Sequence, residues 1–118
     1  FFTKPLKLNR KAAMILHAVY FPIPENTDPK TLAGVMQGLE NLVGQIDGFT
    51  AFHHGLNIDA EGKSPEAQYG FHATYTDRAA LDRYARDPRH QALGARLVAL
   101  CGGADGIKVY DIETDGGS

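Results

Sequence analysis

The stretch "AMILHAVYFPI", residues 13–23, decides the fold of this chain. It is rich in aliphatic, aromatic and β-branched residues and runs into two prolines, which predicts a β-strand. Successive side chains of a strand point to opposite faces of its sheet, and apolar residues here occupy both sets of positions. One set is Met14, Leu16, Ala18 and Tyr20, and the other is Ile15, Val19 and Phe21. The strand therefore needs apolar cover on both faces, and one layer of helices can supply only one of them.

The rest of the chain alternates between helical and strand patterns. Apolar residues at helical spacing, prolines at helix starts and glycines at helix ends mark the helices, and turn-rich polar segments separate the strands. The predicted elements after the first strand are a helix between a cap at Thr27 or Asp28 and Gly48, strands at 49–58 and 67–76, helices at 77–86 and 88–103, and a strand at 106–114.

This βαββαβ order is typical of the ferredoxin-like α+β fold, a four-stranded antiparallel sheet with helices on one face. The uncovered face is apolar, and a second sheet from an identical chain is the most economical cover for it. We therefore expect a homodimer whose sheets face each other as a dimeric α/β barrel. We expect a single domain over residues 13–114, a flexible basic N-terminal arm over 1–12 and a frayed tail over 115–118.

Bulk composition excludes several classes of protein. The formal charge of −2 provides no basic field for nucleic acid, and no apolar run approaches the roughly 20 residues that span a bilayer. The single cysteine, Cys101, cannot form an internal disulfide, which fits a reducing compartment. These features predict a cytoplasmic protein that binds neither nucleic acid nor membrane.

The helix junction "YARDPRHQ", residues 84–91, carries the residues best suited to chemistry. Asp87 can cap the second helix with Pro88 in its first turn. His90 then lies where free backbone N–H groups disfavour a positive charge, so its imidazole should be neutral and able to accept a proton. Helical spacing places His90 on the inward face of its helix and Tyr84 on that of the preceding one.

The segment "ILHAVYF", the βαββαβ order and the junction "YARDPRHQ" together resemble the stress-responsive dimeric α/β-barrel (Dabb) family over residues 13–114. The resemblance implies a homodimer. It also implies that Tyr84 and His90 are a catalytic acid/base pair, because members that are polyketide cyclases use the matching residues without metal or organic cofactor. The family usually has histidine where this chain has Asp87, a departure that weakens the cyclase assignment.

His17 matches a histidine common in the family's first strand, which implies that it binds substrate by orienting a carbonyl or hydroxyl group. Each of these three candidates has a structural alternative. His17 can be a core histidine bonded to a backbone or tyrosine partner, and Tyr84 and His90 can be buried residues whose hydrogen bonds stiffen the junction.

No metal site is predicted. His53 and His54 are adjacent in a strand and therefore point to opposite faces, so the two cannot hold one ion in regular β geometry. His72 can join only one of them, and no carboxylate or cysteine completes the set.

Three kinds of function remain open from the sequence. The chain can be a cofactor-independent enzyme, cyclase- or lyase-like or a monooxygenase, acting on a small aromatic or polyketide-like compound through His90 and Tyr84. It can be a non-catalytic binder of such a compound. It can also be a stress-associated homo-oligomer with a filled core. The space around His17, Tyr84 and His90 separates these cases.

Overall fold

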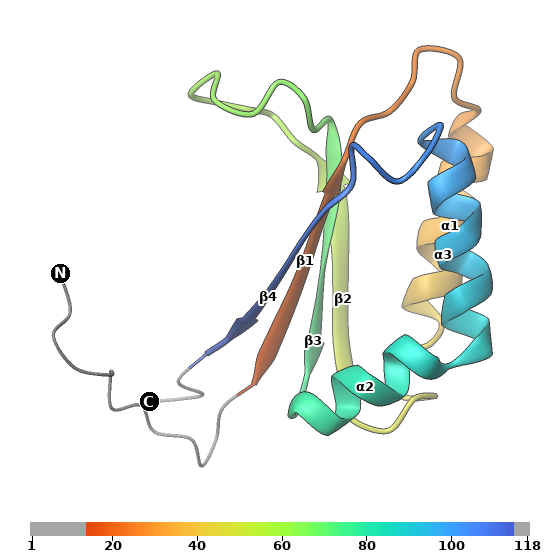
Figure 1. Ribbon diagram of the computed structural model, residues 1–118, viewed down its shortest axis with the longest axis vertical. Helices are drawn as coiled ribbons and strands as arrows, with labels where there is room; N and C mark the ends of the chain where they lie inside the picture. The colour runs from red at the N-terminus through yellow and green to blue at the C-terminus, as the bar shows by residue number, and fades with distance from the viewer. Residues whose placement is uncertain (1–13, 115–118) are drawn as a thin grey trace, which may run out of the picture.

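The computed structural model describes residues 14–114, so the predicted arm at 1–12 and tail at 115–118 lie outside the described residues. Seven helices and strands follow one another in the predicted order (Figure 1). They are β1 (Ile15–Phe21), α1 (Pro29–Glu40), β2 (Phe49–Leu56), β3 (Tyr69–Tyr75), α2 (Arg78–Arg86), α3 (Pro88–Leu100) and β4 (Lys108–Glu113).

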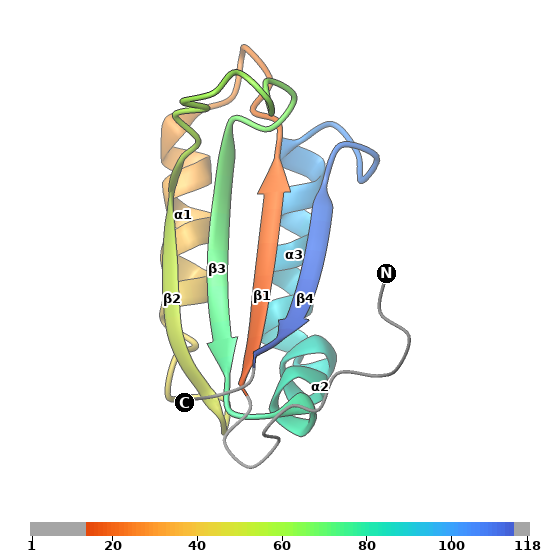
Figure 2. The ribbon, with the colours of Figure 1, turned by 90° about the vertical axis from the view of Figure 1, so that its left-hand side faces the viewer.

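The strands form one antiparallel sheet in the order β2-β3-β1-β4. Strands β2 and β3 form a hairpin, and β1 lies at the centre beside β3 and β4. Helices α1 and α3 run along one face of the sheet, and α2 closes the lower end of the same layer (Figures 1 and 2). The predicted ferredoxin-like α+β fold is therefore confirmed.

The core lies between the sheet and this helical layer. Pairing of β1 with β3 sets Ile15 opposite Tyr75 and Val19 opposite Phe71, and all four side chains are buried. Helix α1 contributes Val35, Met36 and Leu39 to the same core. The prediction that Ile15, Val19 and Phe21 share one apolar face of β1 is thus correct, and this is the face that the helices cover.

The first helix is shorter than predicted. It ends at Glu40, and residues 41–48 form turns in which Leu42 N–H donates to the carbonyl of Leu39. The glycines at 44 and 48 have φ angles of 80° and 87°, a conformation that ends helices. Leu42 and Ile46 are still buried. Their apolar character thus reflects packing in the core, although the segment that carries them is not helical.

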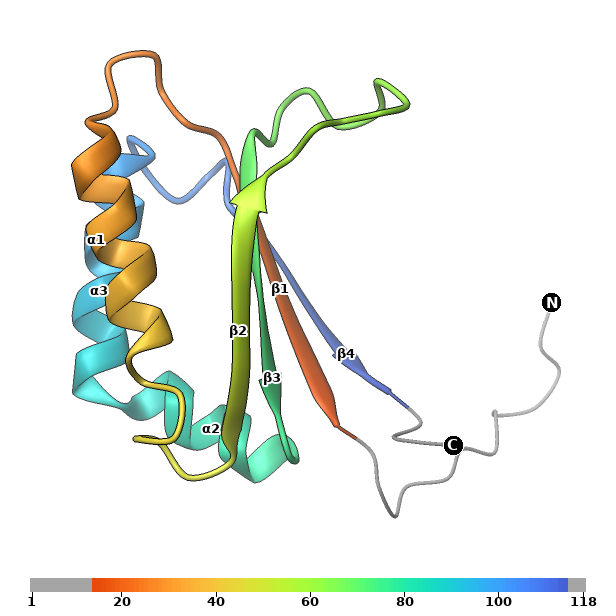
Figure 3. The ribbon, with the colours of Figure 1, turned by 180° about the vertical axis from the view of Figure 1, so that it is seen from behind.

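The opposite face of the sheet has no helix over it (Figure 3). Met14, Tyr110 and Ile112 on this open face expose 42%, 52% and 51% of their surface. The first strand therefore does present apolar residues to two faces, of which its own chain covers one. No helix of residues 14–114 is long and apolar enough to cross a membrane.

Candidate functional site

Asp87 builds the junction between α2 and α3. Its carboxylate accepts a hydrogen bond from the backbone N–H of Arg89 at 2.8 Å, which caps α3, and Pro88 occupies the first turn. The guanidinium of Arg89 also donates to both carboxylate oxygens, at 3.0 and 2.7 Å. These bonds lower the pKa of Asp87 to about 2. Asp87 therefore fixes the start of α3 and with it the position of His90.

A cavity of about 550 Å³ opens beside this junction, between α2 and the start of α3 on one side and strands β1 and β4 on the other. Its polar lining includes all three residues that the sequence singled out. The full lining is Ile15, His17, Arg78, Leu81, Asp82, Tyr84, Ala85, His90, Asp111 and Glu113.

The three candidates meet at the inner end of the cavity. The rings of Tyr84 and His90 lie 3.8 Å apart between centroids, and those of His17 and Tyr84 lie 5.7 Å apart. They come from α2, α3 and β1. The fold thus brings together residues 17, 84 and 90, as the sequence predicted, although it does not by itself assign them roles.

Two of these side chains carry buried polar atoms without a partner. Among residues 14–114, neither the hydroxyl of Tyr84 nor Nδ1 of His90 forms a hydrogen bond. The hydroxyl of Tyr75, which lies beside Tyr84 with ring centroids 5.0 Å apart, is unpaired as well. Buried polar atoms in proteins nearly always have a hydrogen-bond partner, because burying one without a partner costs about 1–3 kcal/mol. The structure thus shows no hydrogen bond at these two atoms of the kind that a stiffened junction predicts, and the role of the pair stays a prediction.

The surroundings of His90 favour its neutral form. Burial lowers the pKa of His90, and the nearby charge of His17 acts in the same direction. The backbone carbonyls of Ala85 and Tyr84 and the carboxylate of Asp87 oppose this shift without reversing it. The imidazole is thus poised to accept a proton at neutral pH.

The surroundings of Tyr84 keep its hydroxyl protonated. Burial raises the pKa of Tyr84, and burial raises that of Tyr75 even further, with the charge of Tyr84 adding to it. The two phenols also affect each other's pKa. Tyr84 can therefore donate a hydrogen bond but is a poor source of phenolate.

Asp111 is a site residue that sequence reasoning missed. Its Oδ1 lies 2.5 Å from Nδ1 of His17, which is its direct partner across the β1–β4 pair. The bond fixes the imidazole of His17 and leaves its other nitrogen, Nε2, for the cavity. The acid in the middle of the strand "KVYDIE" was the available signal, but only the strand order and register place it beside His17.

An ion pair stands at the rim of the cavity. Nε and Nη2 of Arg78 donate to the two carboxylate oxygens of Glu113, at 3.1 and 2.8 Å. Ile15 and Leu81 supply apolar wall further in. The cavity thus combines an apolar side, a charged rim and a polar inner end.

The other histidines do not form a metal centre. His53 pairs with His72 across the β2–β3 hairpin on the open face, whereas His54 lies on the other face and contacts the hydroxyl of Tyr69 at 2.6 Å. Within the described range 14–114, no three His, Cys, Asp or Glu residues are arranged to hold a metal ion.

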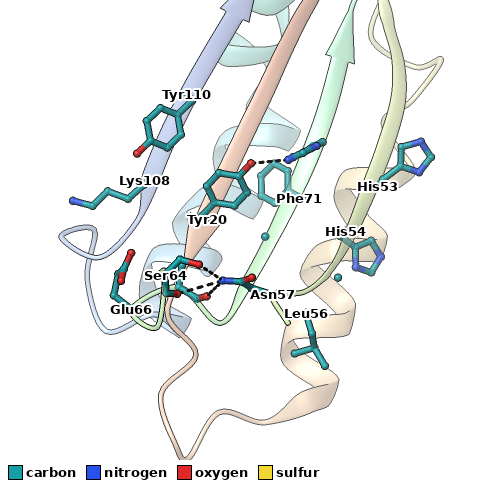
Figure 4. A pocket seen from close by; sticks show the side chains of 14 residues that line it. Tyr20, His53, His54, Leu56, Asn57, Ser64, Glu66, Phe71, Lys108 and Tyr110 are labelled. Carbon is teal, nitrogen blue, oxygen red and sulfur yellow. Dashed lines mark hydrogen bonds between the residues drawn. The ribbon is translucent and has the colours of Figure 1, made fainter. Parts of the chain in front are cut away.

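A second hollow, of about 590 Å³, lies on the open face near the end of the β2–β3 hairpin (Figure 4). The hydroxyl of Tyr20 lies 2.8 Å from Nε2 of His72 on its floor. Gly70 is needed beneath that ring, because a Cβ there would lie 2.6 Å from Tyr20. This hollow lies across the sheet from His17, Tyr84 and His90.

Comparison with known families assigns the fold to one of them. Residues 15–114 match the model of the Stress responsive A/B Barrel Domain, Dabb. The chain belongs to this family. The resemblance seen in its first strand and helix junction is thereby confirmed. No curated protein matches the chain.

Solved structures agree with this assignment. This Dabb chain is similar to a dimeric ferredoxin-like protein of unknown function from Jannaschia sp. CCS1, with 43% identity over 86% of this chain and 99% of that one and a TM-score of 0.81. A Dabb family protein from Mesorhizobium loti shares 23% identity (85% and 95% covered, TM-score 0.65). The hydroxynitrile lyase from Passiflora edulis shares the fold at 12% identity (86% and 93% covered, TM-score 0.73).

Proposed function

We propose that this Dabb protein is a cofactor-independent acid–base enzyme that acts on a small aromatic or polyketide-like carbonyl compound. The observation that carries the proposal is the pair of unpartnered buried polar atoms on Tyr84 and His90 at the inner end of a cavity of about 550 Å³. Ligand pockets range upward from about 300 Å³, so the cavity is large enough for such a compound.

The proposed step is proton abstraction next to a carbonyl group. Neutral His90 takes the proton from the carbon, and the electron pair of the broken C–H bond moves onto the carbonyl oxygen to form an enolate. Tyr84 donates a hydrogen bond to that developing negative charge. The enolate carbon then attacks a second carbonyl or takes back a proton, so no electrons enter or leave the compound.

His17 and Asp111 support the same step from the sheet. Asp111 holds Nδ1 of His17, so that its Nε2 can orient a hydroxyl or carbonyl group of the bound compound. The rim guanidinium of Arg78 gives the mouth of the cavity a cation, although Glu113 pairs with it. A neutral, largely planar compound fits this combination better than a highly charged one.

The test is hydrogen–deuterium exchange at carbon, which requires no knowledge of the product. The purified protein would be incubated in D₂O with β-dicarbonyl compounds, aryl ketones and, in view of the Passiflora neighbour, cyanohydrins, and followed by NMR. We expect catalysed exchange or cleavage for at least one class. The rate should fall about 100-fold or more in His90→Ala, as is usual when a general base is removed, and remain unchanged in His54→Ala.

Two outcomes would favour the other functions. Ligand-detected NMR binding that needs Tyr84 and His90 but gives no exchange would make the protein a binder. Neither binding nor exchange over the whole panel would leave the non-catalytic stress-associated oligomer.

We also propose that the chain forms a homodimer through the open faces of two sheets. Met14, Tyr110 and Ile112 remain about half exposed there, which a monomer of this size has little reason to tolerate as a group. The Jannaschia and Thermobifida fusca neighbours, both described as dimeric, support this assembly. Sedimentation analysis over a dilution series should show a dimer, and a monomer at all concentrations would contradict it.

A cytoplasmic location completes the proposal. Cys101 is the single cysteine of the chain and cannot form a disulfide within it, and burial raises the pKa of its thiol, which disfavours the reactive thiolate. Fractionation of cells that express the tagged protein would test the location.

A further inference from the structure

The loop between β2 and β3, residues 57–68, leaves the sheet on the side away from the helices. Figures 1 and 3 show it projecting beyond the open face, and Figure 2 shows it at the end of the sheet where β2 and β3 meet. A second sheet placed against the open face would therefore lie beside this loop.

Asn57 makes the loop a stiff projection. Its side-chain amide donates to the carbonyl and the hydroxyl of Ser64, at 3.3 and 2.9 Å, and to the carbonyl of Ala67 at 2.7 Å. One residue thus ties the start of the loop to its end, as Figure 4 shows for Asn57 and Ser64.

Asp59 fixes the turn at the tip of the loop. It adopts a left-handed conformation with a φ of 47°, and its Oδ1 accepts hydrogen bonds from the backbone N–H groups of Lys63 and Ser64, both at 2.8 Å. Gln68 anchors the base, because its side-chain oxygen accepts from Ile23 N–H at 2.7 Å.

This ordered loop presents large apolar side chains to solvent. Ile58 exposes 85% of its surface, and Leu56, at the end of β2, exposes 73%. Leu56 lies opposite Tyr69, in the register of the helix-covered face, so Ile58 is the large apolar side chain that the projecting loop itself offers to a chain placed against the open face.

We propose that the β2–β3 loop docks on a second copy of this chain and that Ile58 is its main anchor. The inference rests on the homodimer proposed above and adds a specific contact outside the paired sheets. The stiffness of the loop matters energetically, because a side chain already held in its bound position loses little conformational entropy on association. Burial of the exposed Ile58 side chain against the second copy would supply the favourable hydrophobic contribution to this contact.

The experiment compares dimer dissociation constants by sedimentation and by fluorescence-detected dilution. Ile58→Asp places a charge at the anchor and should raise the dissociation constant by about ten- to a hundredfold, the range expected for loss of an interface anchor. Ile58→Leu keeps an apolar side chain and should retain the wild-type value within about threefold.

Val98→Asp is the matched control, because Val98 is also an exposed β-branched residue, at 37%, but lies on α3 in the helical layer. Its dissociation constant should equal that of wild type. The thermal unfolding of each variant would be recorded as a check that the monomer still folds, which is expected since Ile58 has few contacts in its own chain.

The outcomes separate this inference from the homodimer itself. A wild-type chain that stays monomeric would overturn the homodimer and the docking contact together. A dimeric wild type with an unchanged Ile58→Asp constant would overturn the docking contact alone. Equal weakening by Ile58→Asp and Val98→Asp would also overturn it, because the effect would then follow added charge and not position.

Discussion

Nδ1 of His17 and Oδ1 of Asp111 lie 2.5 Å apart although 94 residues separate them in the chain. The contact exists because β4 pairs with β1 in a register that sets these two residues directly opposite each other. His17 is almost enclosed, with 13% of its side chain exposed, whereas the carboxylate of Asp111 reaches the mouth of the cavity. One partner of this pair is thus nearly buried in the proposed site, and the other is open to solvent.

Asp111→Asn should release the imidazole of His17 from its fixed orientation. We expect a loss of about 1 kcal/mol in the free energy of unfolding, because the pair is only partly shielded from solvent, and a clear change in the His17 ring signals in NMR spectra. Asp47→Asn is the control, since Asp47 forms an exposed ion pair with Arg83 and does not line this cavity. If both variants behave alike, the Asp111–His17 contact is an ordinary surface pair.

Tyr84→Phe should abolish exchange at carbon and yet leave the protein as stable as wild type or more so. The buried hydroxyl has no partner within residues 14–114, so its removal relieves a cost of about 1–3 kcal/mol in the free energy of unfolding. Tyr69→Phe is the matched control, because the Tyr69 hydroxyl bonds to His54 and its loss should destabilise the fold. Urea unfolding measures both, and a destabilised Tyr84→Phe would mean that the hydroxyl is satisfied in solution.

His90 should make the folded protein sensitive to mild acid. Because the pKa of His90 is lowered in the folded state, the unfolded chain binds more protons as the pH falls below the ordinary histidine value of about 6.5. The contribution of His90 to stability is therefore complete above that value, and it is lost as the pH falls from there through the lowered folded pKa.

The measurement is urea unfolding at pH 7.5 and pH 5.0 for wild type and His90→Gln. The variant should lose less stability than wild type between the two pH values, because it lacks the titrating group. An identical pH dependence would show that His90 has its ordinary pKa in the fold, and would remove the support for a neutral base.

Two glycines that precede β2 separate backbone strain from steric overlap. Gly44 and Gly48 have similar φ angles, 80° and 87°, but a Cβ at Gly44 would meet nothing within 4 Å whereas one at Gly48 would lie 2.5 Å from Cβ of Ala80. Gly44→Ala should cost about 1–2 kcal/mol from the left-handed conformation alone. Gly48→Ala should cost distinctly more, as measured by thermal and urea unfolding. If both substitutions lowered the free energy of unfolding equally, α2 would have moved away from the new Cβ at position 48 at no energetic cost.

The sequence by itself determined the element order, the two apolar faces of β1 and the three candidate residues at positions 17, 84 and 90. The element order, the strand faces and the inward positions of Tyr84 and His90 rest on local rules: side-chain alternation in a strand, proline at a helix start and helical spacing. His17 became a candidate through the resemblance of the first strand to the Dabb family. The largest error in the predicted fold, the length of α1, comes from the same local rules. Leu42 and Ile46 keep an apolar spacing that suits a helix, and local pattern cannot distinguish a helical turn from an irregular one packed on the same core.

Only the tertiary structure decided which polar groups meet and which lack partners. The Asp111–His17 bond depends on the register between the first and last strands, and the unpaired hydroxyls of Tyr75 and Tyr84 depend on how α2 packs on the sheet. The size of the cavity depends on the same packing. Such relations depend on contacts between segments that are far apart in the chain. Local periodicity in the sequence does not determine the distances between those segments.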